Sequence, residues 1–228
     1  MKTILRKSLA TFGFELRRIP SRKGGPVAVW DEEGEFDGFH RQVIGRTVVN
    51  KQRCFIIYQL ANHIAGLPGD VAEVGVYRGG TARLLAKTLA ATRKPIHLFD
   101  TFEGMPQTDP MRDTLRKGDF GETSFEDVKN YLRDCRDVRL YPGLFPETAT
   151  PIQDSSFCLA HVDVDIYRSV LDCCEFLYPR LERGGVMIFD DYGDKSCPGA
   201  RMAVDEFFSE KRETPCYLPT GQCIVVRL

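Results

Sequence analysis

The chain has 228 residues, which is long enough to bury one sizeable hydrophobic core. Its hydrophobic content of 43% and charged content of 28% are those of an ordinary globular protein. The formal net charge of −1 argues against a general nucleic-acid-binding protein, because neutralising phosphates requires an excess of Lys and Arg.

The positive charge is concentrated at the N-terminus, where residues 1–23 carry seven basic side chains against Glu15. Residues 4–19 could form a basic amphipathic helix on a membrane surface or another subunit, although a partly ordered arm is the simpler interpretation. We find no unbroken apolar run with the length of a signal peptide or a membrane span. Loop-like composition follows over residues 21–26 and 31–38. The predicted organisation is therefore a basic arm and linker over residues 1–38 and one folded domain over residues 39–228.

The eight cysteines do not form a disulfide or zinc-binding pattern. Cys54, Cys158, Cys173 and Cys174 lie in apolar periodic segments, where a free thiol behaves as a small hydrophobic group. There is no C-x-x-C pair. These features favour a reducing compartment, and we expect the protein in the cytoplasm.

Taken in chain order, the pattern begins with a helix over residues 50–66 and then alternates between strands and helices. The expected strands are 71–76, 95–100, 137–143, 156–165 and 185–191, and the expected helices between and after them are 81–91, 123–135, 169–181 and 200–211. A long loop covers residues 103–122, and Gly184–Gly185 reads as a helix stop. Residues 215–218 and 223–228 form a hairpin at the C-terminus.

Parallel strands need crossover connections, which the helices supply. The sequence thus predicts an α/β fold with a doubly wound, mostly parallel, seven-stranded sheet and an antiparallel C-terminal hairpin.

The first strand runs into a glycine-rich turn, EVGVYRGGTA, in which Gly75, Gly79 and Gly80 allow close approach to a ligand at a helix N-terminus. Tyr77 stands where G-x-G-x-x-G requires its second glycine, so the dinucleotide fingerprint fails. Glu73 would repel a pyrophosphate but suits a cationic ligand. Asp100, at the end of the second strand, can accept hydrogen bonds from a ribose. S-adenosylmethionine fits both acids better than a nicotinamide cofactor does.

Six segments together resemble the macrocin O-methyltransferase family: GDVAEVGVYRGGTA, FDTFEGMP, YPGLFPET, VDVDIYRS, LYPRLERGG and IFDDYG. The resemblance spans about residues 40–228. It implies a Rossmann-like class I methyltransferase fold, S-adenosylmethionine as donor, and magnesium-dependent O-methyl transfer to a hydroxyl of a sugar or glycosylated small molecule. Arg168 and Val170 depart from the family pattern D-x-D-x-Y-E-S-T.

Carboxylates gather at the ends of two strands that we expect to be neighbours. His161, Asp163 and Asp165 alternate along the fourth strand and would share a face. Asp190 and Asp191 end the fifth strand, so the acids should converge and require a cation. The resemblance makes Asp163, Asp190 and Asp191 the magnesium ligands. The alternative is that these aspartates only cap the following helices.

Deprotonating a sugar hydroxyl requires a base. The resemblance assigns that role to Asp165. His161, expected on the same face, is the second choice, although a lone His on a strand is more often a core residue. The expected catalytic set is Asp165, Asp163 and His161. Tyr77, Arg78 and Thr81 would shape the pocket for the methionine end of the cofactor, and Arg78 could pair with its carboxylate. The expected cofactor-binding set is Glu73, Gly75, Tyr77, Arg78, Gly79, Thr81, Asp100, Phe102, Gly143 and Asp163.

Three other functions stay open from sequence: methylation of a phenol or catechol at the same site, a non-catalytic subunit that binds S-adenosylmethionine, and a nicotinamide oxidoreductase. We expect a small-molecule acceptor, no nucleic acid, and a homodimer.

Overall fold

The computed structural model describes residues 28–228, and the amphipathic helix predicted for residues 4–19 lies outside this range. The chain divides into two compact units, residues 1–32 and 33–228. In the described part of the first unit, Val29–Asp31 form a short 3-10 helix, η1. The second unit contains the sheet and the other helices of residues 28–228.

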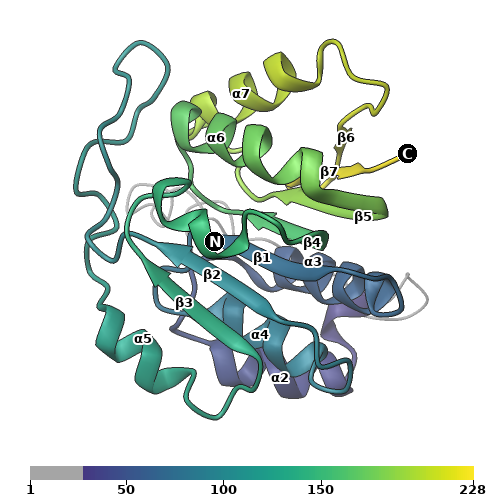
Figure 1. Ribbon diagram of the computed structural model, residues 1–228. Coiled ribbons are helices and arrows are strands. Elements are labelled where there is room, and N and C mark those ends of the chain that lie inside the picture. The colour runs from purple at the N-terminus through teal and green to yellow at the C-terminus, as the bar shows by residue number, and fades with distance from the viewer. Residues whose placement is uncertain (1–27) are drawn as a thin grey trace, which may run out of the picture. The chain divides into compact units, whose positions relative to one another are not determined.

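The second unit is built around a seven-stranded sheet with the order β3-β2-β1-β4-β5-β7-β6 (Figure 1). The strands are β1 (Asp70–Val74), β2 (Ile96–Asp100), β3 (Val138–Pro142), β4 (Phe157–Val162), β5 (Leu181–Phe189), β6 (Cys216–Tyr217) and β7 (Cys223–Val226). The first five strands pair in parallel, whereas β7 is antiparallel to both β5 and β6. This confirms the predicted doubly wound sheet with its antiparallel C-terminal hairpin.

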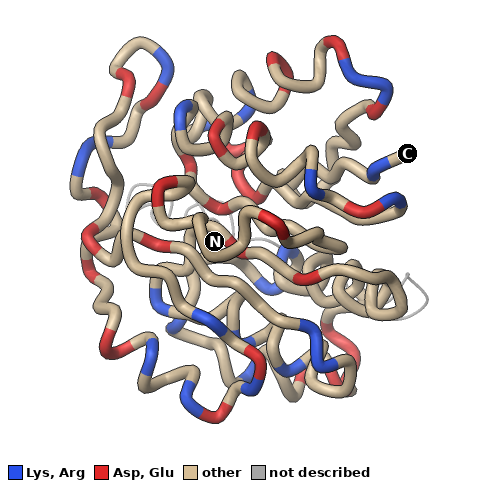
Figure 2. The backbone as a smooth tube through the Cα atoms, viewed as in Figure 1, with Lys and Arg blue, Asp and Glu red and all other residues tan. Residues whose placement is uncertain are grey.

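Helices cover both faces of the sheet (Figure 1). They are α2 (Glu35–Val43), α3 (Lys51–Ile64), α4 (Gly80–Thr88), α5 (Phe125–Tyr131), α6 (Tyr167–Leu177) and α7 (Pro198–Phe208), with 3-10 segments η2 (Glu147–Ile152) and η3 (Tyr178–Arg180). On one face α6 packs against α7, and on the other α2 and α3 pack against α4. Lys and Arg are interspersed with Asp and Glu along the described chain (Figure 2). No described helix is both long and apolar enough to cross a membrane.

Helix α3 illustrates how sequence fixes an element that later carries a functional side chain. The Asn50 side chain caps it by accepting a hydrogen bond from the Arg53 backbone N–H at 3.0 Å. Cys54, Ile57 and Ala61 are fully buried at helical spacing and face the sheet. Arg53 therefore lies beside this apolar stripe in the first turn of the helix.

The register of the sheet aligns the ends of four parallel strands. Val74 of β1 lies opposite both Phe99 of β2 and Val162 of β4, and Val162 lies opposite Phe189 of β5. The residues that follow these positions consequently form one row at the carboxyl edge, where open α/β sheets bind their ligands. The row consists of Gly75, Asp100, Asp163 and Asp190.

The structure corrects three expectations. Strand β4 ends at Val162 rather than at residue 165, and Asp165 has the left-handed φ of +57°, so Asp163 and Asp165 do not continue the face of His161 along a strand. Gly184 and Gly185 lie inside β5 instead of ending a helix, because the chain enters the strand at Leu181 after a short η3. Residues 35–38, expected in a loop, begin α2.

The cysteines behave as predicted, since all eight are free thiols. Cys54, Cys158, Cys173 and Cys174 are each fully buried. Burial raises the pKa of the Cys54 thiol to about 12, so it stays neutral in the core.

Candidate active site

A cavity of about 300 Å³ opens at the carboxyl edge of the sheet. Its walls come from the loops that follow β1, β2, β3, β4 and β5, and from the segment leading into α3. Its lining includes six aspartates: Asp100, Asp163, Asp165, Asp190, Asp191 and Asp194. The lining also contains apolar side chains, among them Val48, Leu115, Phe120, Leu144 and Phe145. The cavity can thus hold a molecule with both polar and apolar parts.

The glycine-rich turn after β1 forms one wall of the cavity. Gly75 has φ +92°, and a Cβ there would lie 1.8 Å from the Asp163 carbonyl oxygen. Only glycine therefore fits where this turn approaches the backbone at Asp163. The backbone N–H groups of Val76 and Tyr77 both donate to Asp100 Oδ2 at 2.7 Å. Asp100 therefore holds the turn in place in addition to facing the cavity.

Asp163, Asp190 and Asp191 meet as predicted, with one carboxylate oxygen from each lying within 4.8 Å of the others. Burial and repulsion from Asp190 raise the pKa of Asp163 well above its usual value. Burial and repulsion from Asp165 raise the pKa of Asp191 in the same direction. Asp191 Oδ2 is buried without a hydrogen-bond partner. Three acids in this arrangement need a cation or protons to neutralise them.

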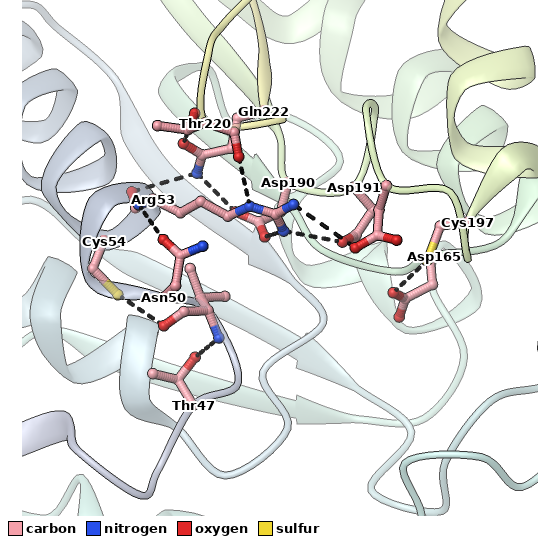
Figure 3. A network of polar contacts seen from close by, with 12 residues as sticks. Thr47, Asn50, Arg53, Cys54, Asp165, Asp190, Asp191, Cys197, Thr220 and Gln222 are labelled. Atoms are coloured by element: carbon pink, nitrogen blue, oxygen red, sulfur yellow. Dashed lines mark hydrogen bonds and ion pairs between the residues drawn. The ribbon is translucent and has the colours of Figure 1, made fainter. Parts of the chain in front are cut away.

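Arg53 is a site residue that sequence reasoning missed. Its Nη1 lies 2.8 Å from Asp190 Oδ2 and 3.4 Å from Asp191 Oδ1, while its Nε donates to the Thr220 carbonyl oxygen at 3.1 Å (Figure 3). Gln222 Nε2 donates to Asp190 Oδ1 at 2.7 Å. In the sequence, Arg53 is a charged residue beside the apolar stripe of a helix that precedes the first strand. That position does not by itself indicate a partner for the side chain.

Glu73 and His161 lie beneath the cavity floor instead of lining it. Both are fully buried, and His161 Nδ1 lies 2.9 Å from Glu73 Oε1 across the β1–β4 pair. His161 Nε2 lies 3.7 Å from Asp190 Oδ1. Burial opposes the charged form, but the acids on both sides raise the pKa of His161 to about 9. The imidazole is consequently protonated at neutral pH and cannot accept a proton from a substrate.

The charged His161 also affects its neighbour Asp190. Burial alone would raise the pKa of Asp190, but hydrogen bonding and attraction from His161, together with the charge of Arg53, hold that pKa below its ordinary value. Asp190 is therefore ionised at neutral pH, whereas Asp163 and Asp191 hold protons more readily.

Asp165 lines the cavity and accepts a hydrogen bond from the Cys197 thiol, whose Sγ lies 3.3 Å from Asp165 Oδ1. Burial raises the pKa of Asp165 above its usual value, against the opposing effect of the Cys197 hydrogen bond. A carboxylate with a raised pKa is a stronger base than an ordinary aspartate. Of the two candidate bases, Asp165 is the one that the structure brings to the cavity.

The predicted loop over residues 103–122 covers one side of the cavity and is anchored at several points. Asp113 Oδ1 accepts a hydrogen bond from the Tyr167 backbone N–H at 2.8 Å, and the Thr114 hydroxyl donates to the Ser196 carbonyl. Leu115 and Phe120 of this loop reach the cavity wall. The loop thereby connects the region after β2 to the start of α6 and to the segment before α7.

The remaining predicted cofactor residues divide between the wall and its support. Tyr77 and Gly143 line the cavity. Arg78 Nε donates to the Glu122 carbonyl at 2.9 Å, Thr81 is buried in α4, and Phe102 packs edge-on against Phe125. Gly79 is the N-cap of α4 with φ +83°. Arg78, Gly79, Thr81 and Phe102 thus shape the turn and the loop around the cavity from outside its lining.

Comparison with known proteins decides the family. The model of the macrocin O-methyltransferase family matches residues 26–216. The chain belongs to this family. It is an O-methyltransferase by descent, and the expected resemblance is confirmed.

Two curated relatives and one solved structure illustrate the similarity. Demethyldecarbamoylnovobiocin O-methyltransferase of Streptomyces niveus is 29% identical over 79% of this chain and 74% of its own length. The 8-demethyl-8-(2,3-dimethoxy-alpha-L-rhamnosyl)-tetracenomycin-C 4'-O-methyltransferase of Streptomyces olivaceus is 32% identical over 59% of this chain and 57% of its own length. The structure of the O-methyltransferase NovP superposes with a TM-score of 0.70 at 27% identity, covering 80% of this chain and 82% of that one.

Proposed function

We propose that the protein transfers the methyl group of S-adenosylmethionine to a sugar hydroxyl of a glycosylated small molecule, with magnesium bound at the carboxyl edge of the sheet. The observation that carries the proposal is the meeting of the glycine-rich turn with the cluster of Asp163, Asp190 and Asp191 in one cavity. Membership of the O-methyltransferase family supports the reaction.

The part of the cavity next to Gly75, Tyr77 and Asp100 is the proposed cofactor site. Asp100 lines this part of the cavity. Its Oδ2 accepts from the Val76 and Tyr77 N–H groups and its Oδ1 from the Phe102 N–H, so a ribose hydroxyl would share these oxygens with the backbone. The aspartates that line the cavity would attract the cationic sulfonium group. Once the methyl group has left, the product is less positive, so the same acids would hold it less tightly.

The aspartate cluster fits a magnesium ion. Its donors are all oxygens, as Mg²⁺ prefers, and Asp191 Oδ2 is buried with no partner of its own. A divalent cation would also relieve the repulsion that raises the pKa values of Asp163 and Asp191. When bound, such an ion stabilises negative charge on an acceptor oxygen.

The chain's own residues supply the remaining chemistry. Asp165 lies in the cavity with a raised pKa and is the proposed base for the acceptor hydroxyl proton. Arg53 and Gln222 fix the orientation of the Asp190 carboxylate from outside. His161 keeps Asp190 ionised from beneath the floor, which makes it a positioning residue rather than a base.

The proposed acceptor class follows from the relatives and from the cavity. The name of the S. olivaceus relative describes a rhamnosyl-bearing substrate. In this chain the aspartates of the cavity lining can receive the hydroxyls of a sugar, and apolar lining residues such as Val48, Leu115, Phe120 and Leu144 can contact an uncharged aglycone.

The experiment is a methyl-transfer assay with isotopically labelled S-adenosylmethionine and two acceptor panels, one of glycosides and one of free phenols and catechols. We expect label in the glycoside panel, in the presence of Mg²⁺, and a loss of transfer when a chelator is added. Transfer confined to the phenol panel would assign the alternative acceptor class. Transfer at the full rate in chelator would remove the metal from the proposal.

Three further expectations accompany this proposal: a cytoplasmic location, a homodimer, and a division of the chain into a basic arm and linker over residues 1–38 and a catalytic domain over residues 39–228. The eight free thiols support a reducing compartment. Size-exclusion chromatography with light scattering would test the dimer, and comparison with a chain lacking residues 1–23 would test the arm.

A further inference from the structure

Cys197 occupies a place in the cavity for which the proposed methyl transfer has no use. It is 5% exposed, lines the cavity, and directs its sulfur at Asp165 Oδ1, 3.3 Å away. One oxygen of Asp191 completes a group in which the three ligand atoms lie within 4.8 Å of one another. This group differs from the all-oxygen cluster in containing a sulfur and in lacking Asp163 and Asp190.

Asp191 belongs to both groups and has a free oxygen. Its Oδ1 contacts Arg53, whereas its Oδ2 is buried and has no hydrogen-bond partner. In Figure 3 the Asp191 carboxylate stands between Arg53 on one side and Asp165 with Cys197 on the other. Asp191 is only 8% exposed, and burial together with the neighbouring acids raises its pKa, so this oxygen needs either a proton shared with a neighbouring carboxyl or a bound cation.

We propose that Asp165, Asp191 and Cys197 form a second metal site, selective for a thiophilic divalent cation of the zinc class. The proposal uses Asp165 and Asp191 of the proposed active site but does not depend on their part in methyl transfer.

The spacing of the ligands fits such an ion. Zinc binds a thiolate sulfur at about 2.3 Å and a carboxylate oxygen at about 2.1 Å, so tetrahedral geometry separates the two ligand atoms by roughly 3.6 Å. The Cys197 sulfur and the Asp165 oxygen are 3.3 Å apart, which requires only a small adjustment. Three protein ligands leave a fourth position open toward the cavity.

The sulfur decides which cations this site prefers. A thiolate selects Zn²⁺ and softer ions, whereas Mg²⁺ prefers oxygen ligands throughout. Binding replaces the S–H bond by a metal–sulfur bond, and the proton leaves to the solvent. Burial raises the pKa of the Cys197 thiol and so opposes this step, but a coordinated metal deprotonates a thiol outright.

Occupation of the second site would inhibit methyl transfer. The cation would take up Asp165, the proposed base, and Asp191, a proposed magnesium ligand. Low concentrations of a thiophilic cation would therefore inhibit at a magnesium concentration that otherwise supports activity. Mg²⁺ shares only Asp191 with this site and does not bind the sulfur, so restoring activity would take a large excess of Mg²⁺ over the thiophilic cation.

The experiment uses Cd²⁺ as the probe, because a cadmium–thiolate bond gives an ultraviolet charge-transfer band. The full chain is titrated with Cd²⁺ alone and, separately, with Mn²⁺ alone. Four proteins are compared: the unaltered chain, Cys197→Ser, Cys216→Ser as a control for an exposed thiol, and Asp163→Asn as a control for the all-oxygen cluster.

We expect one equivalent of Cd²⁺ with a charge-transfer band in the unaltered chain, in Cys216→Ser and in Asp163→Asn. Cys197→Ser should lose the band and bind Cd²⁺ at least tenfold more weakly, while its Mn²⁺ affinity stays within about twofold. A band that persists in Cys197→Ser, or that disappears in Cys216→Ser, would overturn the proposal.

Failure of the magnesium proposal would have a different signature. Asp163→Asn would then leave Mn²⁺ binding unchanged, whatever the result with Cd²⁺. Loss of both Cd²⁺ and Mn²⁺ binding in a Cys197→Ser protein that unfolds at the normal denaturant concentration would show a single shared site, and it would also overturn the second site.

Discussion

Replacing Gly75 by Ala tests whether the tight contact between the glycine-rich turn and the aspartate cluster is required. The new Cβ would lie 1.8 Å from the Asp163 carbonyl oxygen, whereas real Cβ atoms essentially never approach closer than 3.0 Å. The backbone at Asp163 must therefore move by at least about 1.2 Å, the difference between these distances. A movement of that size would break the 2.9 Å hydrogen bond from the Asp163 N–H to the Val74 carbonyl.

Gly118 provides a control with nearly the same backbone conformation. Its φ is +90°, against +92° for Gly75, and no atom lies within 4 Å of its Cβ position. The strain of an L-residue in this region is about 1–2 kcal/mol and applies to both substitutions. The clash and the lost hydrogen bond add about 2–4 kcal/mol at Gly75 alone. The expected loss in the free energy of unfolding is thus about 3–6 kcal/mol for Gly75→Ala and about 1–2 kcal/mol for Gly118→Ala.

Guanidinium unfolding of both variants measures this difference, and calorimetric titration with S-adenosylmethionine measures its consequence for the site. We expect Gly75→Ala to bind the cofactor at least tenfold more weakly and Gly118→Ala to bind it normally. Equal losses of stability in the two variants would show that the turn tolerates a side chain, and the reasoning from the close contact would then be refuted.

Three further predictions concern charged residues of the site. Arg53→Met breaks an ion pair with a buried aspartate and should lower the free energy of unfolding by about 3 kcal/mol. Arg83→Met breaks a pair with a half-exposed aspartate and should lower it by about 1 kcal/mol or less. Similar losses of unfolding free energy in the two variants, measured by denaturant unfolding, would contradict the burial argument. Asp100→Ala should weaken calorimetric binding of S-adenosylmethionine more than Asp165→Ala does, because Asp100 holds the cofactor turn; equal losses would count against this division of roles. The pKa of His161 is about 9 in the folded protein and 6.5 in the unfolded chain, so its stabilising effect is complete below pH 6.5 and is lost as the pH rises through 9. Denaturant midpoints of the metal-free protein should therefore fall over this pH range in the unaltered chain and much less in His161→Gln. Parallel curves for the two proteins would exclude a charged His161.

The sheet could be predicted because each strand carries its own signal. Buried runs such as residues 71–74 and 157–162 alternate with helical patterns, and parallel pairing follows from the crossovers. The end of β4 could not be predicted in the same way. The V-D-V-D alternation continues the strand pattern past Val162, but the chain turns at Asp165 with φ +57°. What ends the strand is the end of its neighbours at Val74 and Phe189, which is a property of the sheet.

The aspartate cluster was predictable for a related reason. Asp163 and Asp190 each follow a buried strand, and neighbouring parallel strands end at the same edge. Arg53 was not predictable, since 137 residues separate it from Asp190 and only the packing of α3 against the sheet brings them together. The assignment of Glu73 to the cofactor missed its burial: it faces His161 across the β1–β4 pair, and no single-strand pattern shows such a partner.

The most direct measurement is an anomalous difference map from a crystal grown with Mn²⁺ and the demethylated product of S-adenosylmethionine. We predict one strong peak within bonding distance of Asp163, Asp190 and Asp191, the product nucleoside along Gly75–Tyr77 with its ribose at Asp100, and Arg53 in contact with Asp190. Density for the nucleoside elsewhere, or a fully occupied nucleoside site with no manganese peak at the three aspartates, would contradict a magnesium-dependent methyl transfer at this edge of the sheet.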